Sequence, residues 1–274
     1  MNIKLTIAYD GSRYLGWQRL KDSEKTIQGK LEDVLSKLLE CAIEISGAGR
    51  TDAGVHAKGQ VANFQVDETY LEEKICQSAG TWREHFKKEL PSGKADEWLC
   101  SALQTYMNHY LPEDIVVLQA EVMPERFHSR LSATGKWYRY RIRNQKVSDV
   151  FSRKYVHHVT ETLDIAAMQK AANILVGTQD FLPYSSLKKT KKSTVRTIRN
   201  ISISQEDGEI IFDYVADGFL YHMVRIITGT LIEVGLHQRD EETLKDALQN
   251  KKRCLAGSLA PAKGLCLMQV FYDK

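Results

Sequence analysis

Residues 135–143 read GKWYRYRIR, and this stretch decides the fold because it starts a second run of the elements that open the chain. Its side chains alternate with a period of two, as in a strand, so that Tyr138 and Tyr140 share one face while Trp137 and three arginines share the other. The N-terminal stretch NIKLTIAY, residues 2–9, alternates in the same way. We therefore expect each half of the chain to begin with a strand.

The same order of elements is predicted after each of these strands. In the first half, apolar residues at helical spacing follow Thr26, QVANFQV predicts a strand at 60–66, two helical stretches flank a loop at 90–98, and a strand covers 114–122. In the second half, an amphipathic helix at 163–177 is expected to end on Gly177, and a hairpin turns at 206–208. A helix with Asp217 near its start then runs to residue 235, and a strand at 264–272 closes the chain.

Strand, helix, strand, helix and strand in each half is the pattern of a ferredoxin-like unit present twice. The sequence therefore predicts an α+β protein with an N-terminal unit at 1–127 and a C-terminal unit at 128–274. No tight sequence repeat connects the halves, so the duplication is inferred from element order alone.

Composition is that of an ordinary globular protein. The 274 residues are 43% hydrophobic and 27% charged, enough apolar material for one large core or two smaller ones. The N-terminus lacks the apolar stretch of a signal peptide, and the most apolar segment, 218–235, is interrupted by His222, Arg225 and Glu233, so no membrane span is expected. Five scattered cysteines without a C-x-x-C pair disfavour disulfides and a zinc site, and favour a reducing cytoplasm.

The net charge is only +3, so a polyanionic partner would have to bind local basic patches. The stretch 136–143 mixes four cations with aromatic rings, a combination that suits stacking on bases and pairing with phosphates. The stretch 188–200, KKTKKSTVRTIRN, has no acid, although such a run is most often a solvated face. Its lysines are Lys188, Lys189, Lys191 and Lys192.

A glycine-rich segment, GAGRTDAGVHAKGQ at 47–60, carries the most unusual combination of residues. Glycine costs backbone entropy on folding, so the shape of this segment must serve a purpose. A nucleotide cradle does not fit, because Val55 follows Gly54 where a lysine is needed and Asp52 stands where a third glycine is needed. A metal site lacks a third ligand beside Asp52 and His56.

Two interpretations of the segment remain. In the first, Arg50 and Asp52 simply pair across a tight surface turn. In the second, Asp52 is a nucleophile or base, held forward on a strained turn and kept ionised by a cation. Arg225, within the apolar stretch FLYHMVRIITG, favours the second, because a buried arginine is costly unless an anion meets it. The alternative is that its head reaches water; the more specific interpretation is that it pairs with Asp52 from the other half of the chain.

Six blocks in order resemble the tRNA pseudouridine synthase A family, and the likeness spans nearly the whole chain. The most specific is GRTDAGVHAKGQV at 49–61. The others are YDGSRYLGWQR at 9–19, LPEDI at 111–115, RFHSRLSATGKWYRYRI at 126–142, GFLYHMVRIITGTLIEVG at 218–235 and APAKGLCLMQVFY at 260–272.

The resemblance implies an enzyme that converts uridines in the anticodon stem-loop of tRNA, at positions 38–40, to pseudouridine. It implies no cofactor and no metal, a homodimer, and two ferredoxin-like units whose antiparallel sheets join into one extended mixed surface. The uridine would have to be flipped out of its stack, at a cost of about a few kcal/mol.

The resemblance also implies roles for single residues. Asp52 would be the catalytic aspartate, which either adds to the uracil ring or attacks the ribose; the sequence leaves both routes open. Tyr138 would stack on the target base and assist a late proton transfer, and Arg225 would pair with Asp52. Arg50 would contact RNA and help hold the flipped nucleotide, and Leu265 would form an apolar wall of the uracil pocket, although core tyrosine and core leucine are the ordinary interpretations of Tyr138 and Leu265.

Two segments depart from the family pattern, and both bear on the choice of RNA. The stretch at 82–100 is longer than the usual connection, and DFLPYSS at 180–186 replaces the D-F-x-x-F of many members. Two alternatives to a tRNA synthase therefore stay open: a synthase of this family acting on another RNA, and an RNA-binding paralogue that has lost catalysis. His56 and Gln60 are expected to shape the glycine-rich segment rather than to take part in chemistry.

Overall fold

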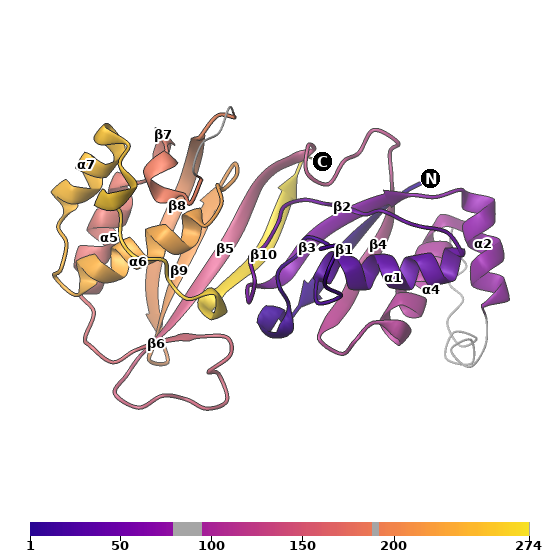
Figure 1. Cartoon of the computed structure of the whole chain (residues 1–274), viewed down its shortest axis with the longest axis horizontal. Helices are drawn as coiled ribbons and strands as arrows, with labels where there is room; N and C mark the ends of the chain where they lie inside the picture. The colour runs from indigo at the N-terminus through magenta and orange to yellow at the C-terminus, as the bar shows by residue number, and fades with distance from the viewer. Residues whose placement is uncertain (79–94, 188–191, 274) are drawn as a thin grey trace. The chain divides into compact units, whose positions relative to one another are not determined.

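The computed structural model describes residues 1–78, 95–187 and 192–273. The chain forms two compact units (Figure 1). Unit 1 comprises Met1–Ala133 with Tyr272–Lys274, and unit 2 comprises Thr134–Phe271. The expected boundary, after residue 127, lies before the structural one because Ser129 is tied into unit 1. Its N–H donates to Oδ1 of Asn63 (2.9 Å), and its carbonyl accepts from the hydroxyl of Tyr272 (2.6 Å).

Along unit 1 the strands and helices follow the order β-α-β-β-α-α-β. Its strands are β1 (Asn2–Tyr9), β2 (Ser46–Gly47), β3 (His56–Gln65) and β4 (Ile115–Met123), and its helices are α1 (Ile27–Leu39), α2 (Glu68–Gln77) and α4 (Ala95–Tyr110). In the sheet β1 lies between β3 and β4, β2 pairs with β3, and all of these pairings are antiparallel. The three helices lie against one another in Figure 1.

The core of unit 1 follows from simple periodicities. Ile3, Leu5 and Ile7 alternate along β1 and are fully buried. Leu31 and Leu35, four residues apart on α1, are buried as well. The helix starts where expected, with the hydroxyl of Thr26 accepting from Gly29 N–H (3.2 Å).

Unit 2 repeats the arrangement with additional short elements. Its strands are β5 (Ala133–Asn144), β6 (His157–Val159), β7 (Gly177–Asp180), β8 (Val195–Glu206), β9 (Glu209–Ala216) and β10 (Leu265–Tyr272). Its helices are α5 (Ile165–Ile174), α6 (Met223–Gly235) and α7 (Glu241–Asn250). The strand order is β10, β5, β9, β8, β7, and β6 runs parallel to the end of β5. The predicted α+β class with two ferredoxin-like units is therefore confirmed.

Strand β5 has the two faces that its sequence predicts. Tyr138, Tyr140 and Ile142 are buried on one face, while Trp137 and Arg139 are only partly covered on the other. The β8–β9 hairpin also turns where expected, because Asp207 (φ 48°) and Gly208 (φ 76°) both adopt the left-handed conformation that a tight two-residue hairpin loop requires.

Helix α6 begins later than predicted. It starts at Met223, after His222 in the left-handed conformation (φ 64°), so residues 217–222 are not helical. Asp217 instead exchanges hydrogen bonds with Thr197 of β8, through its backbone N–H (3.1 Å) and its carboxylate (3.0 Å). The carbonyl of Tyr221 accepts from Ser186 N–H (3.1 Å). These tertiary partners satisfy the backbone that a longer helix would have used.

Two other element boundaries differ from prediction. Helix α5 ends at Ile174, and Gly177 (φ 109°) starts β7 rather than capping the helix. Helix α4 already includes residues 95–98, which were expected to be loop, and acidic Asp96 and Glu97 suit its first turn. The rest of that expected loop lies outside the described residues. In the described ranges, no helix is long and apolar enough to cross a membrane.

Candidate active site

Asp52 lies in a short turn between β2 and β3 of unit 1. The turn closes on itself, since Val55 N–H donates to the carbonyl of Asp52 (3.1 Å), and Gly54 supplies the positive φ of 76°. Thr51 is buried, whereas Asp52 is half-buried. The carboxylate therefore stands on a fixed backbone at the edge of the unit's packed interior.

Three residues of the segment 9–19 brace this turn through hydrogen bonds. Trp17 N–H donates to the carbonyl of Thr51 (3.0 Å), and Gly54 N–H donates to the carbonyl of Tyr14 (3.3 Å). In the interior, the hydroxyls of Tyr9 and Thr51 are hydrogen-bonded at 2.7 Å. Thr51, the residue before Asp52, is thus held by hydrogen bonds to both its main chain and its side chain.

Two glycines allow this close approach. A Cβ on Gly11 would lie 2.0 Å from the carbonyl oxygen of Val55. At Gly16 (φ 104°) a Cβ would lie 2.7 Å from the carbonyl oxygen of Thr51. Both glycines come from the segment 9–19, so the sequence similarity of that segment has a physical basis in contact with the turn.

His56 and Gln60 support the turn from β3, as expected. Both side chains are buried. Nδ1 of His56 lies 3.1 Å from the N–H of Gly11 and 3.2 Å from the carboxylate of Asp10, and Gln60 Nε2 donates to the carbonyl of Gly49 (2.9 Å). These contacts assign both residues to shaping the backbone.

Arg50 is exposed, and its Nε donates to Oε1 of Gln18 (2.9 Å). The sequence prediction did not include Gln18. In the sequence, Gln18 could have been found from its place two residues after Gly16. The positive φ of Gly16 lets the backbone of this segment lie against the turn. Gln18 therefore sets the direction of the Arg50 side chain.

Tyr138, the expected stacking residue, lies on β5 of unit 2. It is 8% exposed, and its ring meets Phe219 edge to face at 5.2 Å between centroids. Tyr214 is its cross-strand partner on β9. Two residues along the same face, the hydroxyl of Tyr140 donates to the carbonyl of Pro261 (2.9 Å), and burial raises the pKa of Tyr140.

Arg225 lies in the first turn of α6 and is half-buried. Its Nε donates to the carbonyl of Ala260 (2.8 Å), and Ala260 N–H donates back to the carbonyl of Arg225 (3.1 Å). A cation at a helix N-terminus is electrostatically unfavourable, so the position is suited to an anionic partner. Leu265, at the start of β10, is 5% exposed.

The aromatic and cationic stretch of β5 is less open to RNA than its sequence suggests. The guanidinium of Arg139 is paired with Asp213 on β9 (2.8 Å), and that of Arg141 with Glu209 (2.7 Å). Trp137 Nε1 donates to the same Asp213. The hydrogen bond to Asp213 raises the pKa of Arg139. Arg143 lies 4.0 Å from the same Glu209, so acids on the neighbouring strand face all three arginines of the stretch.

Other predicted contacts have mixed outcomes. Lys188, Lys189 and Lys191 lie outside the described residues, and Lys192 is exposed. In the segment 180–186, Phe181 and Tyr184 are fully buried, so these rings belong to the core of unit 2. Across the described residues there is no group of three or more His, Cys, Asp or Glu side chains that could hold a metal ion.

Comparisons with known proteins identify the family. A sequence model described as tRNA pseudouridine synthase matches residues 5–130 and 171–273. A "tRNA pseudouridine synthase A 2" of Bacillus cereus is 42% identical over 269 residues, which cover 98% of each chain. A "tRNA pseudouridine synthase A" of a Bacillus species is 43% identical over 266 residues, 97% of each chain.

Among solved structures, the "Crystal Structure of a Cbf5-Nop10-Gar1 Complex" matches 98% of this chain and 50% of that chain, with a TM-score of 0.34 and 11% identity. So distant a likeness indicates nothing about function. The full-length sequence relatives and the family model do, and on them the chain belongs to the tRNA pseudouridine synthase family.

Proposed function

We propose that this chain isomerises uridine to pseudouridine in tRNA. The observation that carries the proposal is Asp52 on a braced turn, in a chain that is similar over its full length to proteins named tRNA pseudouridine synthase A. Family membership indicates the reaction, and the hydrogen-bonded turn holds the backbone of the Asp52 carboxylate in a fixed position. Pre-positioning of this kind is what a rearrangement with no external reagent requires.

The chemistry balances within the nucleotide. The bond from ribose C1′ to uracil N1 breaks, the base turns, and C1′ joins C5. The proton on C5 is removed, and N1 ends with a proton, so no electrons are gained or lost. A redox cofactor is therefore not required, and we expect neither cofactor nor metal. The site must keep the detached base in place, because a released uracil could not be rejoined.

We assign roles to five residues. Asp52 is the nucleophile, at either the uracil ring or the ribose. Tyr138 stacks on the base and takes part in a late proton transfer, and Arg225 pairs with Asp52 and keeps it ionised. The exposed side chain of Arg50 supports the flipped nucleotide, and Leu265 lines the uracil pocket.

The substrate uridines are proposed to lie at positions 38–40 of the anticodon stem-loop. Local patches, including Lys188, Lys189, Lys191 and Lys192, would bind the RNA backbone, since the net charge of +3 offers no strong overall field. We further propose a homodimer that acts in the cytoplasm, the reducing compartment that five free cysteines favour. A synthase for another RNA and a non-catalytic RNA-binding paralogue are the alternatives.

Release of tritium from tRNA labelled at uracil C5 tests the proposal, because C5 loses its hydrogen when it joins C1′. We expect the wild type to release tritium from transcripts with uridine at 38–40. Asp52→Asn should lower the rate by at least about 10³-fold while tRNA is still bound. Asp33→Asn, a change of the same size on α1, is the control and should leave the rate unchanged. Full turnover by Asp52→Asn would contradict the role of Asp52.

A further inference from the structure

Glu32 is a buried carboxylate that the proposed chemistry does not use. Glu32 lies on α1 and is only 3% exposed. Gln28, four residues earlier on the same helix, is half-buried. Burying a carboxylate is costly unless its oxygens accept hydrogen bonds. A buried acid close to a candidate catalytic turn therefore needs an explanation.

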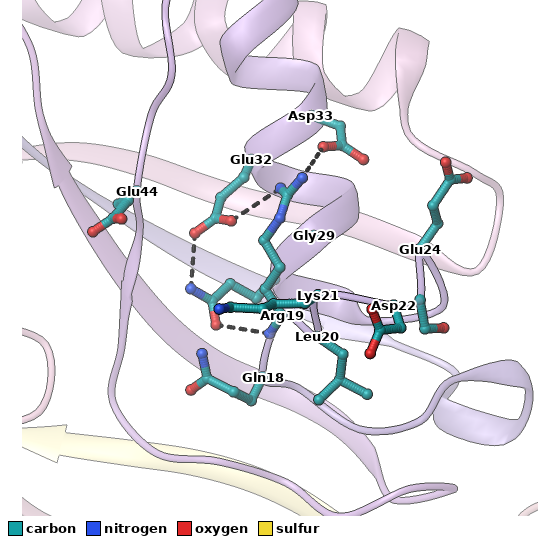
Figure 2. Close-up of a pocket in the computed structure, with 12 residues that line it drawn as sticks. Gln18, Arg19, Leu20, Lys21, Asp22, Glu24, Gly29, Glu32, Asp33 and Glu44 are labelled. Carbon is teal, nitrogen blue, oxygen red and sulfur yellow. Dashed lines mark hydrogen bonds and ion pairs between the residues drawn. The ribbon is translucent and has the colours of Figure 1, made fainter.

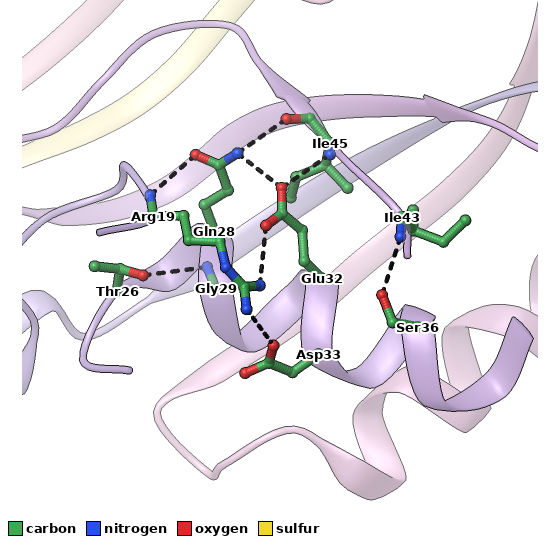
Figure 3. A network of polar contacts seen from close by, with 9 residues as sticks. All are labelled: Arg19, Thr26, Gln28, Gly29, Glu32, Asp33, Ser36, Ile43 and Ile45. Carbon is green, nitrogen blue, oxygen red and sulfur yellow. Dashed lines mark hydrogen bonds and ion pairs between the residues drawn. The ribbon is translucent and has the colours of Figure 1, made fainter. Parts of the chain in front are cut away.

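The carboxylate of Glu32 is bonded by three separate donors (Figure 3). Oε1 accepts from Ile45 N–H (3.1 Å) and from Gln28 Nε2 (2.8 Å), and Oε2 accepts from Arg19 Nη1 (3.1 Å). The donors come from the chain just before β2, from α1 itself and from the segment 16–19. One acid thus fixes both the strand that enters the Asp52 turn and the segment that lies on it.

Gln28 extends this network to the backbone of the segment 16–19. Its Oε1 accepts from Arg19 N–H (3.1 Å), its Nε2 also reaches the carbonyl of Ile45 (3.3 Å), and its own N–H donates to the carbonyl of Trp17 (2.9 Å). Trp17 in turn donates to Thr51, and Gln18 binds Arg50 (2.9 Å). These hydrogen bonds, together with the peptide backbone of the segment 16–19, therefore connect Glu32 to both residues that precede Asp52.

Glu32, Gln28 and Arg19 also border a cavity of about 700 Å³ that Asp52 does not line (Figure 2). Its walls include the acids Asp22, Glu24 and Glu44 besides Glu32, with Arg19 and Lys21 among them. Acids on this wall disfavour a phosphate. Because Glu32 turns inward to its three donors, the network serves the fold around the turn rather than a ligand in the cavity.

We infer that Glu32 and Gln28 are positioning residues for catalysis: they hold the segment 16–19 so that Trp17 and Gln18 fix Thr51 and Arg50 beside the reacting nucleotide's site. The inference rests on the proposed function. A displacement of about 1 Å at a reacting group can cost about 100-fold in rate. The network therefore influences the rate of the chemical step and not the affinity for tRNA.

Glu32→Gln is the direct test, because the amide keeps the shape but leaves a single oxygen to serve three donors. We expect kcat for tritium release to fall about 10- to 100-fold, with an unchanged Kd for tRNA. Gln28→Leu should give a similar loss, and the double variant should lose no more than the worse single variant, since both break one network. All assays are run well below the measured melting temperature of each variant.

Glu44→Gln and Asp33→Asn are the matched controls. Glu44 is an exposed carboxylate on the same cavity wall, and Asp33 pairs with the same Arg19 from the surface side (3.0 Å). Both variants should keep the wild-type kcat. Full kcat in folded Glu32→Gln and Gln28→Leu would overturn the inference, as would an equal loss in the controls.

A second measurement separates this inference from the proposed function. Hydrogen exchange at the N–H groups of Trp17 and Gly54 reports the two bonds that clamp the turn. We expect faster exchange at both in Glu32→Gln and Gln28→Leu, and wild-type exchange in Glu44→Gln. A wild type without synthase activity would contradict the proposed function, whereas unaltered exchange in both network variants would contradict the positioning role.

Discussion

Asp52 combines an ordered backbone with a partly exposed carboxylate. The four glycines around it suggest mobility in the sequence, yet Thr51 is fixed through its hydroxyl by Tyr9 and through its carbonyl by Trp17. Glycine serves here to admit neighbouring backbone rather than to loosen the turn. Because the turn is already ordered in the folded protein, positioning a nucleophile on it costs no further conformational entropy in each reaction.

Tyr138→Phe separates stacking from proton transfer. The ring, held edge-on to Phe219, is retained, while the hydroxyl is lost. We expect a large fall in kcat with little change in tRNA affinity. Tyr140→Phe is the control on the same face: it loses the bond to Pro261 and about 1 kcal/mol of stability, but no activity. If Tyr138→Phe turned over at the wild-type rate, the tyrosine would only be a stacking surface.

Gly11→Ala tests how tightly the neighbouring segment lies on the turn. The added Cβ would meet the carbonyl of Val55 at 2.0 Å, so the backbone would have to shift. We expect a loss of about 1–3 kcal/mol in the free energy of unfolding, measured with denaturant, together with a lower kcat. Stability and turnover at wild-type values would show that the contact is looser than described.

Strand β5 shows what alternation can and cannot predict. Its two faces are as expected because a period of two is intrinsic to a strand. The pairing of Arg139 and Arg141 with Asp213 and Glu209 was not predictable, because it depends on the register with β9. Cations that resemble an RNA-binding patch in the sequence are thus partly balanced across the hairpin.

The helices show the same division. The N-terminus of α1 follows from local capping by Thr26, whereas the start of α6 is set by tertiary hydrogen bonds to Asp217 and Tyr221. The prediction missed α7, although Asp240 followed by two glutamates is a recognisable N-terminal signal. The sequence did not identify Glu32 as a buried residue either. A glutamate four positions after a glutamine on a helix ordinarily forms a solvent-exposed pair with it.

Asp240 gives the N-terminus of α7 a testable pH dependence. Its carboxylate accepts from the hydroxyl of Thr243 (2.7 Å) and from Thr243 N–H (2.9 Å), and these bonds lower the pKa of Asp240. Since the folded pKa lies below the unfolded value of about 3.9, the contribution to stability is complete above that pH and is lost as the pH falls through the folded pKa.

Thermal melts of the wild type and Asp240→Ala at several pH values measure this effect. The gap between their melting temperatures should be widest near neutral pH and should narrow below about pH 4. Asp240→Asn is the control, because its amide oxygen can cap the helix without titrating. A gap that is constant or grows toward acid would contradict the assignment.

Across the whole molecule, RNA binding is expected to depend on local charge. Changing Lys188, Lys189, Lys191 and Lys192 to glutamine should weaken tRNA binding and reduce the slope of log K against log salt by about 0.7–0.9 for each phosphate that the variant no longer neutralises. Lys170 and Lys245 are already paired with Glu241 (2.8 Å) and Glu242 (3.0 Å) of α7, so their double variant is a suitable control. An unaltered slope would show that these lysines are solvated and do not contact the RNA phosphates.

The sequence predicts the class of the whole molecule better than the support of its site. Repeated element order was enough for two α+β units, because the alternation of strands and helices in each half follows from local periodicity. Asp52 and Arg225 were proposed from their residue types as well as from motif similarity, and Tyr138 was proposed from motif similarity. Gln18, Gln28 and Glu32 were not, because their importance lies in contacts between segments distant in sequence.

The central claim is that this chain isomerises uridines of the anticodon stem-loop and that Asp52 is its catalytic residue. The most direct measurement is pseudouridine mapping of total RNA from cells that carry the wild-type chain, the Asp52→Ala variant or no copy of the gene. We predict pseudouridine at tRNA positions 38–40 with the wild type only. Modification that persists with Asp52→Ala, or signals confined to another RNA, would contradict the account.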